Sequence, residues 1–409
     1  KDLGKSREES WITEIGFVIN EIDHTIARLH HWMKPEKVRT NLINLPSGSY
    51  VYKEPLGAVL IIGPWNYPLQ LLFSPLVGAL AAGNCVVLKP SEYAEATAAV
   101  MKTIISSAFS TDYVLYTPGD GAVVVPAMMK HFRFDHVFYT GNAFTGRLVY
   151  QMAAEKLVPV TLELGGKTPC VIEHDADLTV AARRIAVTKF SNTGQMCVAP
   201  DYLLVHESVQ QRFMEKLAEV LRKFFTDRAE LNPGYGRIIN ERHFERLISY
   251  LECGTIVTGG RYDKETRFLE PTILKDVPEN SAVMQEEIFG PILPVFPFST
   301  PESALQLIAR NPDPLAFYIF TQNDKKAEWW LRQVPSGGAC VNNASWHLTN
   351  PDLPFGGRGS SGTGRYHGRY SFETFTHLKA VLKTPAWFDP SLRYPPFQGK
   401  LGLFKKLFR

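Results

Sequence analysis

The first part of the chain alternates short apolar runs, rich in β-branched residues, with longer runs of helical length. The apolar runs cover residues 57–63, 85–89, 113–116 and 136–141, and runs of helical length follow them at 69–82, 94–109, 121–130 and 143–156. Strands that alternate with helices form parallel sheets, and their apolar runs indicate burial on both faces. The pattern between Gly57 and Glu163 therefore predicts a βαβ series with helices on both faces of a parallel sheet.

After Gly165 the pattern predicts a second α/β unit, so that the whole chain belongs to the α/β class. We expect helices at 178–190, 209–225 and 325–333, strands at 202–206 and 315–322, an end of the unit near Phe355, a Gly- and Ser-rich loop at 356–368, and a strand over 371–377.

The first fifty residues predict simpler elements. Residues 11–33 have Ile15, Val18, Ile19, Ile22 and Ile26 at helical spacing, which predicts an amphipathic helix that packs through these side chains. Residues 41–54 predict a hairpin with its turn at 46–48.

Composition excludes several classes of protein. A formal charge of +3 over 409 residues gives no reason to expect nucleic-acid binding. The five cysteines are far apart and never spaced as CxxC, which argues against a disulfide framework and a zinc site, so we expect no bound metal and a reducing compartment. There is no run of eighteen apolar residues, and the polar start KDLGKSREES is no signal peptide. We expect a cytoplasmic protein, with peripheral attachment to a membrane left open.

Cys197 is the candidate nucleophile, in a turn between a predicted helix and a predicted strand, close to Gly194. Most free cysteines are buried small hydrophobes. A thiol with a pKa of about 8.5 is mostly protonated at pH 7, so a nucleophilic cysteine needs a base or a positive environment. Glu163, in an apolar strand before Gly165, should be desolvated, which raises its pKa and makes it a usable base.

The motifs around these two residues, LELGGK at 162–167 and GQMCVAPDY at 194–202, resemble the signature of the aldehyde dehydrogenase superfamily. Their form resembles the class 3 branch, which includes fatty aldehyde dehydrogenases. Further motifs of that family follow in order: GPWNYP at 63–68, LKPSE at 88–92, YTG at 139–141, EEIFGP at 286–291, LPFGG at 353–357 and SFETF at 371–375.

The resemblance implies an aldehyde dehydrogenase-like fold, with a Rossmann-like nucleotide domain, an α/β catalytic domain and a small bridging β element. It places the nucleotide-binding domain at 1–40 and 55–163, the catalytic domain at 164–368, the bridging strands of a homodimer at 41–54 and 369–385, and a tail at 386–409. In the class 3 branch helical residues precede the counterpart of Asp2–Ser6, so we expect this chain to be truncated and to begin at the end of a helix.

The resemblance also assigns the catalytic parts. Cys197 would be the nucleophile, and its backbone N–H and the side-chain amide of Asn66 would hold the oxyanion. Glu163 would be the base for the thiol or for the water that releases the product.

The cofactor implied is NAD, with NADP also accepted. The fingerprint GxGxxG is absent, and Thr140, Gly141 and Asn142 open a helix that would face the pyrophosphate. The remaining positions are assigned by resemblance: Lys89 and Glu92 to the adenosine ribose, Glu287 to the nicotinamide ribose, Phe289 to the nicotinamide ring, Pro64 and Trp65 to the cofactor, and Trp65, Tyr67, Trp346 and Met196 to the aldehyde pocket.

Three positions depart from the class 3 pattern. Met196 stands where Thr is usual, Asn142 stands where Ser is usual, and Arg358 replaces a small apolar residue. Asn142 still caps a helix well.

The function that follows is NAD(P)-dependent oxidation of aldehydes, medium- or long-chain aliphatic or aromatic, to carboxylic acids through a cysteine thiohemiacetal and thioester. A CoA-acylating dehydrogenase is one alternative, against which the presence of Glu163 as a water base argues. A non-catalytic structural or binding protein on the same fold is another, against which the intact Cys197, Glu163 and Asn66 argue.

The end of the chain predicts a surface helix. Leu401, Phe404, Leu407 and Phe408 recur at helical spacing, and Lys400, Lys405, Lys406 and Arg409 fill other positions. This helix would contact anionic lipid or dock on the partner subunit, and the sequence does not separate the two.

Overall fold

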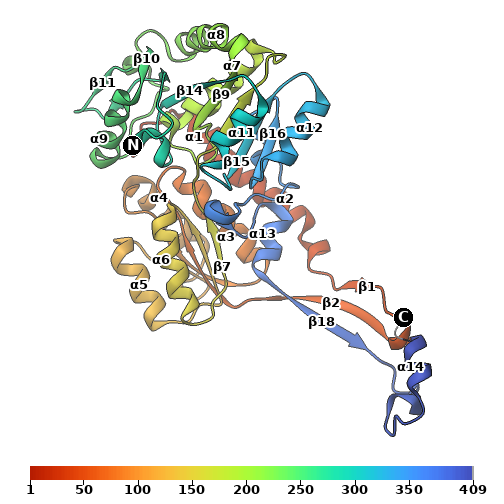
Figure 1. The fold of residues 1–409 in the computed structure, drawn as a ribbon. Coiled ribbons are helices and arrows are strands. Elements are labelled where there is room, and N and C mark those ends of the chain that lie inside the picture. Colours follow the sequence, from red (N-terminus) through yellow and green to blue (C-terminus); the bar gives the residue numbers. More distant parts are fainter. Residues whose placement is uncertain (408–409) are drawn as a thin grey trace.

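The computed structural model describes residues 1–407, without the side chain of Leu407, so the predictions for that side chain, Phe408 and Arg409 lie outside the described residues. The first sheet has six strands in the order β17-β7-β6-β3-β4-β5 (Figure 1). Five strands are parallel, and β17 (Gly362–Thr363) runs antiparallel to β7 at one edge. The other bounds are β3 Ala58–Ile62, β4 Cys85–Lys89, β5 Val114–Tyr116, β6 His136–Thr140, β7 Val160–Glu163, α3 Pro68–Ala81, α4 Glu95–Ala108, α5 Gly121–His131 and α6 Ala143–Ala154. The predicted βαβ series is confirmed.

The second sheet has seven strands in the order β10-β13-β14-β9-β8-β15-β16. All are parallel except β10, which pairs antiparallel with β13. The bounds are β8 Pro169–Ile172, β9 Tyr202–His206, β10 Thr255–Thr258, β13 Thr272–Lys275, β14 Ile292–Phe298, β15 Ala316–Phe320, β16 Gly338–Val341, α7 Leu178–Phe190, α8 Glu207–Phe225, α9 Glu241–Ser249, α10 Ala282–Gln285, α11 Pro301–Ala309 and α12 Asp324–Gln333. A short ladder of β11 (Tyr262–Asp263) and β12 (Phe268–Leu269) lies beside it.

One hydrophobic core joins the two sheets. It contains Val59 and Phe138 from the first sheet, Leu203 and Tyr318 from the second, and Cys197 packs against it from the connection between α7 and β9. The turn that carries Cys197 therefore lies where the two units meet.

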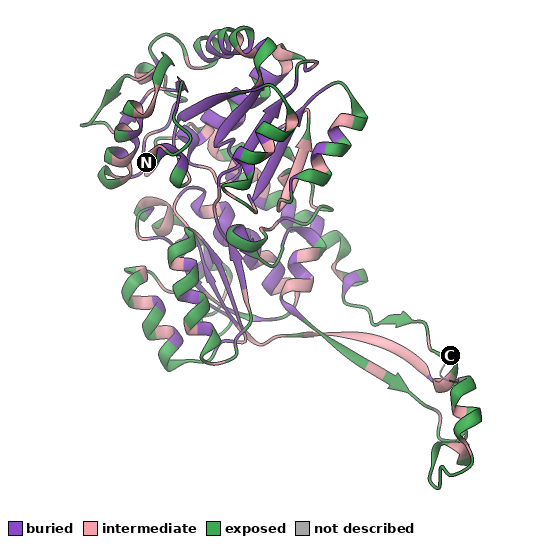
Figure 2. Cartoon of the chain, viewed as in Figure 1, coloured by how far each residue is buried: buried purple, intermediate pink, exposed green. Residues whose placement is uncertain are grey.

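The arm is a three-stranded sheet in the order β1-β2-β18 that extends away from both units (Figure 1). Its strands are β1 (Glu36–Val38), β2 (Gly48–Pro55) and β18 (Thr376–Lys383). The predicted hairpin was wrong in its limits, because β1 begins earlier and residues 42–44 form a 3-10 turn instead of a strand. β2 is half-buried and most of β18 is exposed (Figure 2).

The strand predicted over 371–377 is wrong in its first half. Residues Gly368–Thr374 form helix α13, and β18 begins at Thr376. Ser371 Oγ accepts a hydrogen bond from the backbone N–H of His367 at 2.8 Å, which helps to start the helix. Phe372 of α13 and Phe375, which directly follows the helix, are both buried.

The helical segment near the start of the chain is confirmed, but its predicted packing face is wrong. α1 (Arg7–Ser10), a π-helical turn (Trp11–Ile15) and α2 (Gly16–Trp32) form it, and residues 1–6 before it are not helical. Of the predicted stripe, Val18 is buried in the core, but Ile15, Ile19, Ile22 and Ile26 are exposed. The buried polar residues of this segment are Glu14, Glu21, His24 and Thr25. Helical spacing identifies a stripe, and here the hydrogen bonds of buried carboxylates decide which side faces the core.

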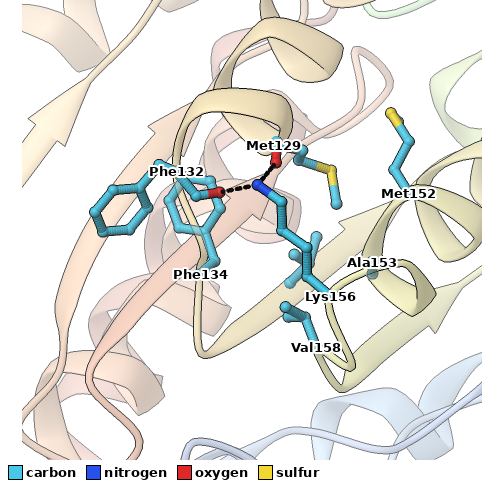
Figure 3. Close-up of a pocket in the computed structure, with 8 residues that line it drawn as sticks. Met129, Phe132, Phe134, Met152, Ala153, Lys156 and Val158 are labelled. Atoms are coloured by element: carbon cyan, nitrogen blue, oxygen red, sulfur yellow. Dashed lines mark hydrogen bonds between the residues drawn. The ribbon is translucent and has the colours of Figure 1, made fainter.

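A small apolar pocket lies between α5 and α6. Figure 3 shows Lys156 crossing it to the end of α5, where Nζ donates to the backbone oxygens of Met129 at 2.6 Å and Phe132 at 3.3 Å. These bonds satisfy carbonyls that the end of a helix leaves without partners. The pocket contains none of the predicted site residues.

Candidate active site

Cys197 follows a short turn, Ser191–Gly194, that comes directly after α7. The side chain is partly buried, and burial raises the pKa of its thiol, with the carboxylates of Glu287 and Glu163 raising it further. The thiol is therefore protonated at neutral pH, and it needs a neighbouring base to become a nucleophile.

Asn66 lies against the cysteine turn. It precedes α3 and is buried, and its Nδ2 donates to the backbone oxygen of Gln195 at 3.0 Å. An amide group carries two N–H bonds, so the second remains for a ligand beside Cys197. The structure thus brings the predicted oxyanion donor to the turn of the predicted nucleophile, through a bond that joins residues 129 positions apart.

Glu163 ends β7 and is buried. Neither carboxylate oxygen has a hydrogen-bond partner among the described residues, and burial raises the pKa of Glu163 well above its ordinary value. The sequence predicts this direction. A carboxyl group of raised pKa that lies near the thiol is suited to accept a proton near neutral pH.

Glu287 lies near the same thiol. A side chain at Gly165 would overlap the Glu287 carboxylate, so only glycine leaves room for this close approach. Burial raises the pKa of Glu287 well above its ordinary value, and Asp201 contributes in the same direction. Each of these two carboxyl groups, when ionised, raises the pKa of the Cys197 thiol.

The segment that carries Glu287 is anchored by residues to which the sequence analysis gave no role. Lys167 donates to the backbone oxygens of Val283 at 2.7 Å and Glu286 at 3.0 Å, and it forms a buried ion pair with Asp201. Asp201 accepts a hydrogen bond from the backbone N–H of Ile288 at 3.0 Å. Lys167 and Asp201 lie inside the two motifs around Glu163 and Cys197, and this position in the sequence could have identified them.

Lys189 completes this charged group from α7. It is fully buried, its Nζ has no hydrogen-bond partner among the described residues, and burial lowers its pKa to about 8. Asp201 and Glu287 act in the opposite direction and favour its charged form.

Lys89 and Glu92 form a pair at the end of β4. Lys89 Nζ donates to Glu92 Oε2 at 3.0 Å and to the backbone oxygen of Pro90 at 2.6 Å. Both side chains lie close to Gly121, the first residue of α5. Two hydroxyls of a ribose can be held by a carboxylate and an ammonium in this arrangement, and Glu92 retains partial exposure to a ligand.

Thr140 ends β6, and Gly141 and Asn142 connect it to α6. Asn142 Oδ1 accepts a hydrogen bond from the backbone N–H of Thr145 at 2.9 Å, which confirms that Asn142 caps the helix. Thr140 Oγ1 is buried and has no partner among the described residues. An orphaned hydroxyl beside a helix N-terminus, at the carboxyl ends of parallel strands, fits the phosphates of a dinucleotide.

The aromatic residues expected near the substrate divide into two groups. Trp65, which follows Pro64, lies edge-on to Phe289, with the two ring centroids 5.3 Å apart. Tyr67 is buried, and burial raises the pKa of its hydroxyl group. Negative charge on Cys197 raises the same pKa further. Met196 packs beside Cys197 against the core. Trp346 is 60% exposed, so the structure does not enclose it.

Arg358 has a defined partner of its own. Its Nε lies 2.7 Å from Asp313 Oδ1, and its backbone and Ser361 form reciprocal hydrogen bonds. The departure from the class 3 pattern at this position therefore fixes a turn beside β17 through an ion pair.

Residues 1–407 contain neither a metal-binding cluster nor a membrane-spanning helix. They hold no group of three or more His, Cys, Asp or Glu side chains arranged to bind a metal. No helix within the same residues is long and apolar enough to cross a membrane.

Comparison with known proteins identifies the family of this chain. The model of the aldehyde dehydrogenase family matches residues 1–381. The 4,4'-diaponeurosporen-aldehyde dehydrogenase of Staphylococcus aureus is 44% identical, with 100% of this chain and 89% of that protein covered. The dimeric NADP-preferring aldehyde dehydrogenase of Canis lupus familiaris is also 44% identical, over 98% of this chain and 88% of its own length.

Solved structures agree with these sequence relatives. The substrate-bound state of Staphylococcus aureus AldH superposes with a TM-score of 0.97 at 44% identity, covering 100% of this chain and 89% of that one. The NAD+ complex of an aldehyde dehydrogenase from Bacillus cereus has a TM-score of 0.83 at 29% identity, covering 94% and 78%. The aldehyde dehydrogenase-like fold is thereby confirmed, and the chain belongs to the aldehyde dehydrogenase family.

Proposed function

We propose that this protein oxidises aldehydes to carboxylic acids with NAD(P)+, through a covalent bond between the aldehyde carbon and Cys197. The observation that carries the proposal is that the Asn66 amide bonds to the turn two residues before Cys197, while the buried carboxyl group of Glu163 lies close enough for its charge to raise the pKa of the Cys197 thiol. Nucleophile, oxyanion donor and base are the three protein groups that acyl-forming oxidation requires.

The protein residues act in two stages. Cys197 adds to the carbonyl carbon while its proton passes to Glu163, and the Asn66 amide and the Cys197 backbone N–H hold the oxyanion. NAD(P)+, when bound along the carboxyl ends of the first sheet, supplies the hydride acceptor. Once Glu163 has released the thiol proton to solvent, it takes a proton from water as the water attacks the thioester. The bond between carbon and sulfur then breaks, the acid leaves, and the sulfur takes this proton from Glu163 to restore the thiol.

The Lys89–Glu92 pair and the Thr140–Asn142 turn would hold the adenosine ribose and the pyrophosphate of the cofactor. Glu287, anchored through its neighbours, would hold the nicotinamide ribose, and Phe289 and Trp65 would lie against the nicotinamide. The family motifs support these assignments.

The substrate class that we propose is a medium- or long-chain aliphatic aldehyde or an aromatic one. Met196 packs against the same core as Cys197, and Tyr67 is buried close enough to Cys197 to sense its charge, and apolar surroundings of this kind favour apolar substrates. The name of the Staphylococcus aureus relative, 4,4'-diaponeurosporen-aldehyde dehydrogenase, agrees with this class.

We also propose a cytoplasmic homodimer. A three-stranded ribbon with exposed edges is marginal on its own, and one relative is named a dimeric aldehyde dehydrogenase. The tail could add a contact with anionic lipid, because Leu401 and Leu403 of α14 (Leu401–Leu407) are exposed beside Lys405 and Lys406.

The test is a mixture of the protein with NAD+ or NADP+ and aldehydes of increasing chain length. We expect reduced nicotinamide, followed by its absorbance, and a carboxylic acid product identified by mass spectrometry. A dependence on added CoA, with an acyl-CoA product, would favour the CoA-acylating alternative. Binding of the dinucleotide without turnover of any aldehyde would favour a non-catalytic role.

A further inference from the structure

The turn before Cys197 has an uncommon backbone conformation. Three consecutive residues have positive φ angles, Asn192 at 48°, Thr193 at 55° and Gly194 at 74°. All three are buried. A β-branched residue such as threonine rarely adopts this region, and such strain persists only where the surrounding structure holds it in place.

The Asn192 side chain joins this turn to Asn66. Its Nδ2 donates to the backbone oxygen of Asn66 at 2.8 Å and to the backbone oxygen of Gln195 at 3.1 Å. The same Gln195 oxygen accepts the hydrogen bond from the Asn66 amide. One buried amide therefore links the two loops that carry the oxyanion donor and the nucleophile.

A carboxylate from the start of the chain holds Asn192 itself. The backbone N–H of Asn192 donates to Glu9 Oε1 at 2.6 Å, across 183 residues of sequence. Glu9 lies on α1 and is half-buried. A hydrogen bond from a backbone N–H to a carboxylate is among the stronger kinds in proteins.

The same N-terminal segment also braces the loop of Asn66. Glu14 Oε2 accepts a hydrogen bond from the backbone N–H of Leu69, in the first turn of α3, at 2.9 Å. Lys5 pairs with Glu14, and its Nζ lies 4.5 Å from the centre of the Tyr67 ring. Residues 5–14 thus contact both the loop that carries Asn66 and the turn before Cys197.

We propose that Glu9 and Asn192 are positioning residues for aldehyde oxidation. The Glu9 carboxylate holds the left-handed turn, and Asn192 transmits that position to Asn66, so that the oxyanion donor and Cys197 keep a fixed separation. The inference rests on the proposed function, because it assigns Asn66 and Cys197 to one reaction.

The test compares Glu9→Ala with Glu9→Gln and with the matched control Glu8→Ala, which removes an exposed carboxylate of the same helix. We expect Glu9→Ala to lower kcat by about ten- to a hundredfold, because misplacing a reacting group costs rates of that order. The Kd for NAD(P)+ should stay unchanged. Glu9→Gln should recover most of the rate, because its amide oxygen still accepts the hydrogen bond.

Equal kcat values for Glu9→Ala and Glu8→Ala would overturn the proposal, as would an equal loss in Glu9→Gln and Glu9→Ala. If Glu9→Ala does not fold, Asn192→Asp decides, because it keeps the shape but loses both N–H donors. A normal kcat in folded Asn192→Asp would also overturn the proposal.

Alkylation of Cys197 by iodoacetamide, without dinucleotide, separates this inference from the proposed function. We expect the alkylation rate to change in Glu9→Ala and to stay at the wild-type value in Glu8→Ala and Glu9→Gln. This result would stand even if the wild type oxidised no aldehyde, and an unchanged rate in Glu9→Ala would count against the positioning role.

Discussion

Two regions of the molecule differ in how their residues are held. One is the group of polar residues at the junction of the two sheets, and the other is the set of strands that forms the arm. At the junction, Asn66, Asn192 and Gln195 are at most 3% exposed and bond to one another. In the arm, most residues of β18 are exposed and β2 is half-buried, although the two strands pair over their whole length (Figure 2).

This difference in burial and bonding indicates that the two regions have different roles. The junction fixes reacting groups by internal hydrogen bonds, so a single change there should alter the chemistry strongly. The arm has no core of its own, so its role depends on what it contacts, and changes there should affect assembly or substrate access while the chemistry of small substrates continues.

The largest effect should come from removing the nucleophile. Cys197→Ala should abolish oxidation, because the covalent bond to the aldehyde carbon cannot form, while the Kd for NAD(P)+ stays close to that of the wild type. Steady-state assays with isothermal titration would measure both. Turnover above background in this variant would show that another residue carries the covalent step.

The next largest effect should come from the base. Glu163→Gln should slow release of the acid by about a hundred- to ten-thousandfold, the range of general base catalysis. A burst of reduced nicotinamide should precede a slow steady state, and the acyl-enzyme should be visible by mass spectrometry. Wild-type steady-state turnover in Glu163→Gln would remove Glu163 from the base role.

The raised pKa of Glu163 adds a dependence on pH. Burial favours the protonated form of Glu163, so the pKa of this group is higher in the folded protein than in the unfolded one. Its contribution to stability is therefore complete at pH values below the pKa of the unfolded protein, and it is lost as pH rises through the pKa of the folded protein. The wild type should therefore gain activity and lose stability relative to Glu163→Gln over the same rise in pH. Denaturant unfolding of both proteins at several pH values would measure the difference, and parallel stability curves would contradict this account.

The sequence predicts elements well where local pattern and packing agree. The helix over Leu178–Phe190 and the strand over Tyr202–His206 have the predicted bounds, because their apolar residues face the core. Short elements such as β10 and β13 were not predicted, since four residues carry too little periodicity. The domain limits and site roles stay predictions.

The failures arise where long-range polar contacts override the local pattern. Glu21 of α2 accepts a hydrogen bond from the backbone N–H of Gly368, 347 residues away, and the isoleucine stripe of the same helix faces outward. The contact of Glu9 with Asn192 has the same character. A motif indicates that Cys197 is special, but no spacing in the sequence indicates which distant carboxylate holds its turn.

A smaller effect is expected at the cofactor site. Because Glu92 should repel a 2'-phosphate on the adenosine ribose, the wild type should bind NAD more tightly than NADP, with the neighbouring Lys89 limiting the difference. Glu92→Gln should shift the ratio of Kd values towards NADP by about tenfold, comparable to one charge interaction near a surface. The exposed Glu95→Gln on α4 is the matched control. Tighter binding of NADP than NAD by the wild type would contradict the argument.

The smallest effect on chemistry should come from the tail, at the far end of the arm. Leu401 and Leu403 are exposed, whereas Phe404 packs against Phe397 with ring centroids 5.9 Å apart. Each basic residue near an anionic surface contributes about 1 kcal/mol, so a short basic helix gives only weak attachment.

Deleting residues 397–409 should reduce binding to anionic vesicles and turnover of long-chain aldehydes, while short aldehydes react at nearly the same rate. Vesicle flotation and parallel kinetics with neutral vesicles as the control would measure both. If the truncated protein floats as well as the full chain but changes its oligomeric state, the tail docks on the partner subunit, and if neither changes, it only packs on its own arm.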